Sequence, residues 1–380
     1  MRTFQGRPIA TIVVDGEEVE IVKGIAAKPR FKSFGTAAGD LAFAANYVAL
    51  RFPGADRAES DESAEPVYIH YGAAGPNNPR HPEQWGLSYI HAERAWKAWH
   101  GDAGSVVLAV LDTGIPMENG KLSHPDLAGG RFVLGLNAVA EGQEPRDDHG
   151  HGSHVTGIAA AARNSAIGIA GLWQGRVYAV KVLDSHNRGT DLTFEAGVAA
   201  ALDFAAKRHT RLVINYSGYT KVDNRTMRGA VEDAADAGAL LVCAAGNENG
   251  GKVRYPACYS TQNPTVVAVG ATDRSGALCH VSSDGPEITL CAPGQDILST
   301  LPNYPVTWNT DAHKSTDYDI ATGTSMACPF VAALAAMVWS QKPSAAAADI
   351  RAHLIATALS TPPPLLCGII DAGKALEKPL

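Results

Sequence analysis

Hydrophobic residues in the central part of the chain form short continuous runs, separated by longer segments with helical periodicity. The runs are four to seven residues long, at 106–111, 177–183, 212–216, 240–245 and 266–269. A strand buried on both faces is typically continuous in hydrophobicity, whereas a strand with one solvent-exposed face alternates. The five runs therefore predict strands at the centre of a sheet that is covered on both sides.

Helical periodicity fills the gaps between these runs. We expect helices at 89–99, with Ser88 as the N-cap, and at 151–162, 192–207, 226–237 and 330–339. Gly238 directly follows the fourth of these segments, in the place where glycine commonly ends a helix. The repeated strand–helix–strand order predicts an α/β fold with a mostly parallel central sheet and helices on both of its faces.

The first part of the chain has a different pattern. Residues 9–14 and 19–22 are predominantly apolar, and Asp15-Gly16 between them is a hairpin turn signal. We expect a short helix at 43–50 and a solvated acidic linker at 56–65. The chain is therefore predicted to consist of a small N-terminal extension at 1–66, a connecting arm at 67–84 and a main domain at 85–380.

Composition excludes several classes of protein. Of the 380 residues, 46% are hydrophobic and 19% are charged, as in globular domains and unlike disordered chains. The net charge is −7 and lysine and arginine do not cluster, so we expect neither nucleic acid nor an anionic membrane surface as a partner. We also expect no membrane span, because no apolar run approaches the roughly 18 residues that a span needs.

The six cysteines leave the redox state open. Their spacing does not resemble a zinc site. Cys279 and Cys291 are placed to face each other across a hairpin, and we expect them to pair if the protein is exported. Cys243 and Cys328 lie in apolar runs and are expected to be buried free thiols. The N-terminus lacks the apolar core of a signal peptide, so the protein is expected to be cytoplasmic if Met1 is the native start, and secreted if a signal peptide was removed.

Residues suited to acyl transfer stand at the ends of the predicted strands. Asp112 directly follows the strand at 106–111, and Asn247 follows the strand at 240–245. Sites in parallel sheets gather outside the carboxyl ends of the strands. A carboxylate there can orient a histidine, and an amide N–H can stabilise a developing oxyanion.

Two histidines open the helix at 151–162. His151 and His154 are three residues apart and therefore lie on one helix face. Metal binding is one interpretation, but it needs a further ligand at suitable spacing, and the glutamate of the zinc-protease pattern His-Glu-x-x-His is missing. One histidine acting as a base beside the carboxylate of Asp112 fits the sequence better, so we expect no metal in this site.

Ser325 occupies a glycine-led turn that opens the apolar helix at 330–339. A serine hydroxyl needs a base to remove its proton, and a turn at a helix N-terminus would hold it rigidly and favour negative charge beside it. The same turn is also a common N-cap arrangement. Because four acyl-transfer residue types stand at four strand or helix ends, Asp112, His151, Asn247 and Ser325 are the candidate catalytic set.

Four motifs resemble those of the subtilisin-like serine proteases, the subtilase family. They are Val-Leu-Asp-Thr-Gly-Ile around Asp112, His-Gly-Ser-His-Val-Thr-Gly around His151, Ala-Ala-Gly-Asn around Asn247 and Gly-Thr-Ser-Met-Ala-Cys-Pro around Ser325. The order Asp, His, Ser is the subtilisin order. The resemblance extends over residues 77–376 and implies the subtilisin-like three-layer fold.

The resemblance implies a role for each candidate. Ser325 would attack the scissile carbonyl, His151 would take and return its proton, and Asp112 would hold the imidazole. Asn247 would form the oxyanion hole with the backbone N–H of Ser325, and His154 would be structural. The implied activity is that of a serine endopeptidase with peptide or protein substrates and no cofactor. We expect a monomer.

The resemblance also implies a substrate site. An extended peptide would lie between two edge segments, Asn187-Arg188-Gly189 and Ser217-Gly218. The pocket for the side chain before the scissile bond would be walled by Ser217, Gly218, Ala244, Ala245, Gly246 and Arg254, with Tyr219 at its rim. Arg254 would favour acidic substrate side chains if its guanidinium faces the pocket. If Arg254 faces solvent, the pocket would be an ordinary apolar one.

A structural calcium ion belongs to the resemblance as well, with Asp126 and the loop after the helix at 151–162 among its ligands. The loop at 163–171 is about three residues shorter than the family pattern, so we expect too few oxygen ligands for an ion that takes roughly six to eight. Near the nucleophile, Cys328, Phe330 and Ala333 replace the residues common in the family. These replacements imply repacking behind the site without loss of a catalytic atom.

Three questions stay open. A ligase or cyclase would form the same acyl-enzyme and resolve it with an amine in place of water. A non-catalytic peptide-binding scaffold of this fold would have lost its chemistry, although all four candidate residues are present here. The segment at 1–66 is either an inhibitory prosegment, removed near the acidic linker or within 77–84, or an extension that stays on the enzyme.

Overall fold

The computed structural model describes residues 76–360 and 367–380, together with five strands before them. The chain divides into two compact units, Met1–Ala74 and Gly75–Leu380. The strands of the first unit are β1 (Thr3–Phe4), β2 (Arg7–Val14), β3 (Glu17–Lys23), β4 (Tyr47–Leu50) and β5 (Val67–Tyr68). The candidate site lies wholly within the second unit.

In the first unit, β2 and β3 form the predicted hairpin. They pair antiparallel, with Ile9 opposite Val22 and Val14 opposite Glu17. The helix predicted at 43–50 is wrong over its last four residues, which form strand β4 and pair with β3. A short apolar run does not distinguish helix from strand. Here these residues pair with the edge of β3 and therefore form a strand. The predicted linker lies outside the described residues.

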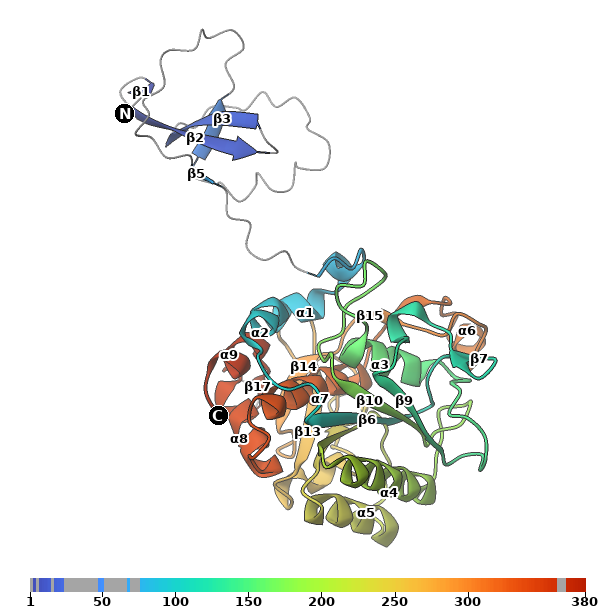
Figure 1. The fold of residues 1–380 in the computed structure, drawn as a ribbon. Coiled ribbons are helices and arrows are strands. Elements are labelled where there is room, and N and C mark those ends of the chain that lie inside the picture. Colours follow the sequence, from blue (N-terminus) through green and yellow to red (C-terminus); the bar gives the residue numbers. More distant parts are fainter. Residues whose placement is uncertain are drawn as a thin grey trace. The chain divides into compact units, whose positions relative to one another are not determined.

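The second unit contains an eight-stranded sheet in which every neighbouring pair is parallel (Figure 1). Its order is β17-β14-β13-β12-β11-β6-β10-β9, so the five predicted hydrophobic runs lie at its centre. The strands are β6 (Val106–Asp112), β9 (Phe132–Asn137), β10 (Arg176–Lys181), β11 (Arg211–Tyr216), β12 (Leu240–Ala244), β13 (Val266–Thr272), β14 (Leu290–Pro293) and β17 (Gly368–Ile369).

Helices cover both faces of this sheet, which confirms the predicted α/β architecture (Figure 1). α3 (His151–Ala160) and α7 (Thr324–Gln341) pack on one face. α4 (Asp191–Arg208) and α5 (Arg225–Asp236) pack on the other. Gly238, at φ +73°, follows the end of α5 as expected for a glycine that closes a helix.

Two hydrophobic cores lie on the two sides of the sheet. The even-numbered residues of β6 from Val106 to Val110 belong to the core with α3 and α7. The odd-numbered residues from Val107 to Leu111 belong to the core with α4 and α5. A strand between two cores has no polar face, which explains why the sequence runs are continuous.

The segment before β6 folds as two short helices. α1 (Trp85–Tyr89) and α2 (Ala92–Ala98) are separated at His91, whose φ is +58°. The single helix predicted at 89–99 is therefore wrong, and Ser88 lies inside α1. Both helices pack on the same core, so apolar periodicity continues across the break and does not reveal it.

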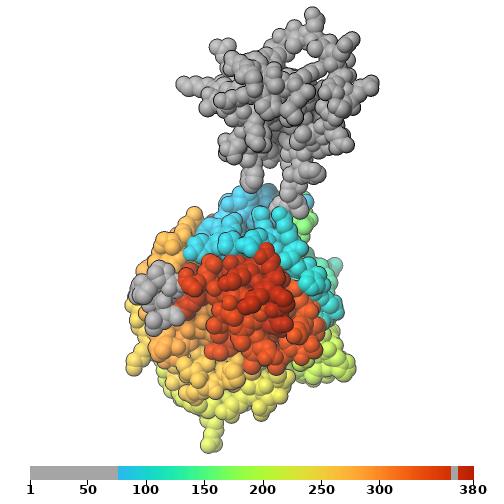
Figure 2. Space-filling view, turned by 90° about the vertical axis from the view of Figure 1, so that its left-hand side faces the viewer, coloured from blue at the N-terminus to red at the C-terminus, as the bar shows by residue number. Residues whose placement is uncertain are grey.

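The remaining elements complete the domain. α9 packs against α2, so that the C-terminal helices, in red, lie beside the first helices of this unit, in cyan (Figure 2). These further elements are β7 (Met117–Glu118), β8 (Lys121–Leu122), β15 (Ile297–Thr300), β16 (Tyr318–Ala321), α6 (Thr307–Asp311), α8 (Ala347–Thr357), α9 (Ala372–Glu377) and the 3₁₀ turns η2 (His81–Glu83), η3 (Pro125–Leu127) and η4 (Ala257–Thr261).

α7 is the central helix of the domain, and all of it except Gln341 is buried. Its 18 residues have a mean hydropathy of 1.2, which meets the length and composition of a membrane span, and 94% of them are buried. The expectation that no apolar run approaches this length is therefore wrong. The burial identifies α7 as a core helix, because a helix that is hydrophobic all round needs protein on all sides.

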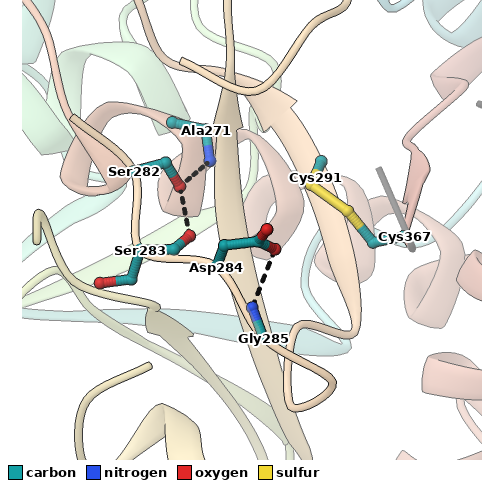
Figure 3. Close-up of a disulfide and its surroundings, with 7 residues drawn as sticks. All are labelled: Ala271, Ser282, Ser283, Asp284, Gly285, Cys291 and Cys367. Atoms are coloured by element: carbon teal, nitrogen blue, oxygen red, sulfur yellow. Dashed lines mark hydrogen bonds between the residues drawn. A yellow bond between two sulfur atoms is a disulfide. The ribbon is translucent and has the colours of Figure 1, made fainter. Parts of the chain in front are cut away.

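One disulfide joins cysteines of the described residues. Cys291 in β14 is bonded to Cys367, which is 76 residues later and directly precedes β17 (Figure 3). The expected pairing of Cys279 with Cys291 is wrong, and Cys279 is a buried free thiol. β14 is parallel to β13 and its other neighbour is β17, so no hairpin brings these two cysteines together. Cys243 and Cys328 are buried free thiols, as predicted.

We predict that the Cys291–Cys367 bond contributes about 4 kcal/mol to the free energy of unfolding, from the entropy of closing a loop of this length. Denaturant unfolding of Cys291→Ser/Cys367→Ser measures it, with Cys258→Ser as the control that removes a thiol outside the bond. Thiol titration of the unfolded, unreduced protein should count the four free cysteines. Equal stability of the two variants, or six thiols before reduction, contradicts the prediction.

Candidate active site

Asp112 and His151 meet at the carboxyl edge of the sheet. Asp112 is the last residue of β6, and His151 is the first residue of α3. Asp112 Oδ1 and His151 Nδ1 are 2.7 Å apart, and both side chains are buried. A carboxylate only accepts hydrogen bonds, so Nδ1 carries the proton and Nε2 is the basic nitrogen of the neutral ring.

A second buried carboxylate, Asp147, fixes the start of α3. It accepts the backbone N–H groups of His149, Gly150 and Ser153 and the hydroxyls of Ser153 and Thr113. The N-cap of α3 is Gly150, which has no side chain, so Asp147 satisfies N–H groups that the helix leaves unpaired. Burial alone would raise the pKa of Asp147, but these hydrogen bonds outweigh it and lower the pKa.

Ser325 lies in the first turn of α7 and is tied to the end of β11. Its hydroxyl donates to the Ser217 carbonyl at 2.9 Å, and the Ser217 hydroxyl donates to the Ser325 carbonyl at 3.1 Å. The second bond has a structural reason, because Pro329 has no N–H to donate to the carbonyl four residues earlier. The helix start predicted at 330 is wrong, since α7 begins at Thr324 and Pro329 lies inside it. Ser217 supplies the donor that the proline lacks.

Asn247 contacts the start of the same helix. Its Oδ1 accepts the backbone N–H of Thr324 at 2.9 Å and the Thr324 hydroxyl at 3.0 Å. These bonds orient the amide and leave its NH₂ group available as a donor. Gly323 makes room for that group: its φ is +155°, and a Cβ there would lie 3.1 Å from Asn247 Nδ2. A side chain in place of Gly323 would therefore crowd the amide.

One cleft of about 690 Å³ is lined by His151, Asn247 and Ser325. Both predicted edge segments, Asn187–Gly189 and Ser217–Gly218, line it too. Apolar and aromatic side chains complete much of its wall: Leu183, Tyr216, Tyr219, Met227, Trp308 and Met326. The exposed lining is nevertheless more polar than apolar, and a concave surface with convergent polar groups is what a substrate site needs.

The structure does not bring the other predicted pocket residues to the surface of this cleft. Ala244, at the end of β12, and Ala245 are fully buried, and Gly246 is also buried. They and Arg254 are not among the residues that line the cleft. The Arg254 backbone N–H donates to the Ala245 carbonyl, which holds the two segments together.

The Arg254 guanidinium is paired within the protein. Its Nη2 lies 3.0 Å from Glu248 Oε2, and Lys221 Nζ lies 3.3 Å from Glu248 Oε1. The hydrogen bond from Arg254 lowers the pKa of Glu248, so the carboxylate is charged at neutral pH. Because Glu248 holds the guanidinium and Arg254 does not line the cleft, Arg254 is not placed to bind an acidic substrate side chain. The arrangement favours the apolar alternative for the pocket.

Trp308, which sequence analysis did not identify, forms a wall of the cleft beside His151. It lies in α6, and its ring centroid is 5.3 Å from that of His149, 5.7 Å from that of His151 and 5.8 Å from that of His154. Its backbone N–H donates to the His149 carbonyl, which fixes α6 to the start of α3. No motif marks this residue, because its role depends on a contact between distant segments.

His154, for which the resemblance implies a structural role, is not among the residues that line the cleft. It is fully buried, and its Nε2 lies 3.1 Å from the Asp319 carbonyl oxygen. Burial lowers the pKa of His154 to about 3, so the ring is neutral at physiological pH. Among the described residues, no group of three or more His, Cys, Asp or Glu side chains is arranged to hold a metal ion.

Comparison with known proteins identifies the family. The model of the subtilase family matches residues 103–375. The chain is 35% identical over 285 residues to thermitase of Thermoactinomyces vulgaris, a match that covers 74% of this chain and 91% of thermitase. The chain belongs to the subtilase family.

Other relatives of this subtilase are also proteases by name. It is 36% identical over 281 residues to subtilisin Savinase of Lederbergia lenta, covering 73% of this chain and 91% of that protein. It is 36% identical over 282 residues to the thermophilic serine proteinase of Bacillus sp. (strain AK1), covering 74% of this chain and 63% of that protein. The chain is thus a subtilisin-like serine endopeptidase by family and by these relatives.

We predict that the His151 ring titrates above about 6.5, the usual pKa of histidine. Burial alone would lower the pKa of His151, but the charge and hydrogen bond of Asp112 outweigh it and raise the pKa. Asp112→Asn should move the titration to lower pH, because burial then dominates. NMR titration of the ring tests this, with Asp148→Asn as a control that removes a carboxylate paired with Lys181. An unmoved titration in Asp112→Asn would refute the assignment.

Proposed function

We propose that this subtilase hydrolyses peptide bonds through an acyl-enzyme formed on Ser325. The observation that carries the proposal is a single cleft that brings together Ser325, the oriented amide of Asn247 and the His151 ring with Asp112 behind it. These side chains are the parts that acyl transfer needs: a nucleophile, a donor to the oxyanion, a base and a carboxylate that orients the base.

The reaction follows in two steps. First, Nε2 of His151 accepts the Ser325 hydroxyl proton as the oxygen attacks the carbonyl carbon, and this proton passes to the leaving amine as the C–N bond breaks. Second, water attacks the acyl carbon and gives a proton to His151, which returns it to Ser325 as the acyl C–O bond breaks. Asp112 stabilises the imidazolium, and Asn247 with the Ser325 backbone N–H stabilises the oxyanion in both steps.

Substrate binding would also prepare the nucleophile. In the described structure the Ser325 hydroxyl donates to the Ser217 carbonyl. A substrate strand that pairs with the Ser217–Gly218 edge would donate its own backbone N–H to this carbonyl. The hydroxyl would then be free to turn toward His151. This agrees with the general finding that catalytic hydrogen bonds tighten only when the substrate is bound.

Ligation and a non-catalytic scaffold are the alternatives. A ligase would release the acyl group to an amine, so its products from a defined peptide would include joined peptides, whereas hydrolysis adds one water to each cleavage. A scaffold would release neither product. Three of the four residues line one cleft and Asp112 is bonded to His151 there, which supports catalysis over the scaffold.

A fluorophosphonate probe should label the wild-type protein and not Ser325→Ala, as judged by intact mass. Asn247→Ala should lower kcat by about 10²–10³ with a small change in KM, because the amide acts mainly in the transition state. Product masses from a defined peptide distinguish hydrolysis from ligation. The proposal is contradicted if the probe still labels Ser325→Ala, or if the folded wild-type protein is not labelled.

We further predict a preference for large apolar side chains before the scissile bond, because Glu248 holds the Arg254 guanidinium and Arg254 does not line the cleft. Glu248→Gln should release the guanidinium and raise kcat/KM for substrates with Asp or Glu at this position by about tenfold. Glu232→Gln, an exposed position on α5, is the matched control. A positional peptide library measures both variants, and an acidic preference already present in the wild type would show that the prediction is wrong.

A further inference from the structure

The loop that follows α3 gathers four oxygen atoms around one nitrogen. Asn78 Nδ2 lies 2.9 Å from the Ala162 carbonyl oxygen, 2.6 Å from that of Ile167 and 2.8 Å from that of Ile169. It is also 3.0 Å from the Ser165 hydroxyl oxygen. An amide NH₂ has two N–H groups, so four acceptors at this range are more than the side chain can satisfy singly. Oxygens that converge on one point in this way resemble the ligand shell of a hard cation.

The position of this shell is the one where the family resemblance implies calcium. Asp126 accepts the Ile169 backbone N–H through Oδ2, and its backbone carbonyl accepts the Ala162 N–H. The loop therefore supplies oxygens that its length had led us to expect it to lack. The centre of the shell, however, is taken by the Asn78 amide.

The orientation of the Asn78 amide is determined by its own contacts. Its Oδ1 accepts the backbone N–H of Asn164 at 2.9 Å, so the NH₂ group and not the oxygen faces the shell. The side chain is only 2% exposed. A cation at this point would have to displace Nδ2 from the three carbonyl groups, whose partial negative charges the amide already matches.

Only one of the two carboxylate oxygens of Asp126 is hydrogen-bonded in this structure. Its Oδ2 accepts the Tyr318 hydroxyl at 2.9 Å as well as the Ile169 N–H, and its Oδ1 is buried without a hydrogen-bond partner. The neutral amide of Asn78 therefore fills the shell without needing a charged group beside it.

We propose that the Asn78 side-chain amide takes the place of a structural cation in the loop at 162–169, so that this fold needs no calcium at that position. The amide joins the segment before α1 to the loop after α3 by hydrogen bonds, which is the role a cation would have. The substitution Asn78→Asp provides the converse: a carboxylate oxygen would face four oxygens, and a divalent cation would relieve the repulsion.

The test is thermal unfolding in EDTA and in CaCl₂, in a Ser325→Ala background that prevents self-digestion. The Tm of this parent should be the same in both solutions. Asn78→Asp should melt lower in EDTA, by on the order of 5 °C, and recover in CaCl₂. Asn77→Asp is the matched control: it makes the same change at the exposed neighbouring residue and should show no calcium response.

The outcomes separate the proposal from its rival. A parent Tm that falls in EDTA, with the fall abolished by Asp126→Asn, would mean that calcium displaces the amide and would overturn the proposal. If the parent Tm falls in EDTA and Asp126→Asn does not abolish the fall, the calcium acts at another part of the chain. In that case the proposal is tested by whether CaCl₂ raises the Tm of Asn78→Asp more than it raises the Tm of the parent. An Asn78→Asp variant with no added response to CaCl₂ also overturns it.

Discussion

The parallel register of β6, β11 and β12 is the constraint on which the site depends. Leu111 in β6 is paired with Tyr216 in β11, and β12 continues in the same direction. The three strands therefore end at one edge of the sheet, and the chain segments that follow them leave it side by side. Asp112, Ser217 and Asn247 all come from these ends. A one-residue slip of any of the strands would exchange its two faces and remove its residue from the group.

The two helices on one face complete the site, and each has a start that its own sequence leaves incomplete. The N-cap of α3 is a glycine, so the helix depends on the Asp147 carboxylate for hydrogen-bond acceptors. α7 contains Pro329 and depends on Ser217 for a donor. The groups that stabilise these helix starts are thus the same groups that position His151 and Ser325. Stability of the fold and geometry of the site rest on one set of hydrogen bonds.

Local sequence signals were sufficient for the central strands and for the candidate catalytic set. A strand between two cores is continuous in hydrophobicity, and a residue that directly follows such a strand is placed at its end. Asp112 and Asn247 could be located in this way. His151 could be located because a helix begins there, and Ser325 because it lies in a glycine-led turn before an apolar helical segment.

The features that sequence analysis missed depend on contacts between distant segments. Cys291 forms a disulfide with Cys367, which is 76 residues later in the sequence. Trp308 contacts His151 from the segment that connects β15 and β16. The ion pair of Arg254 with Glu248 depends on how two turns are folded against each other, which residue spacing does not reveal. Asp147 and its neighbour Asp148 are both aspartates before a helix, and only burial shows which one holds it.

The anchoring of Asn78 in the loop after α3 limits where the chain can be cut without harm. Asn77 and Asn78 together accept the backbone N–H groups of Ala166 and Asn164, so both residues are part of the folded domain. Cleavage within 77–84, one of the two places expected for removal of a prosegment, would detach this contact from the domain. Maturation that preserves the fold would therefore have to occur before Asn77, so that the side chains that close the loop stay on the domain.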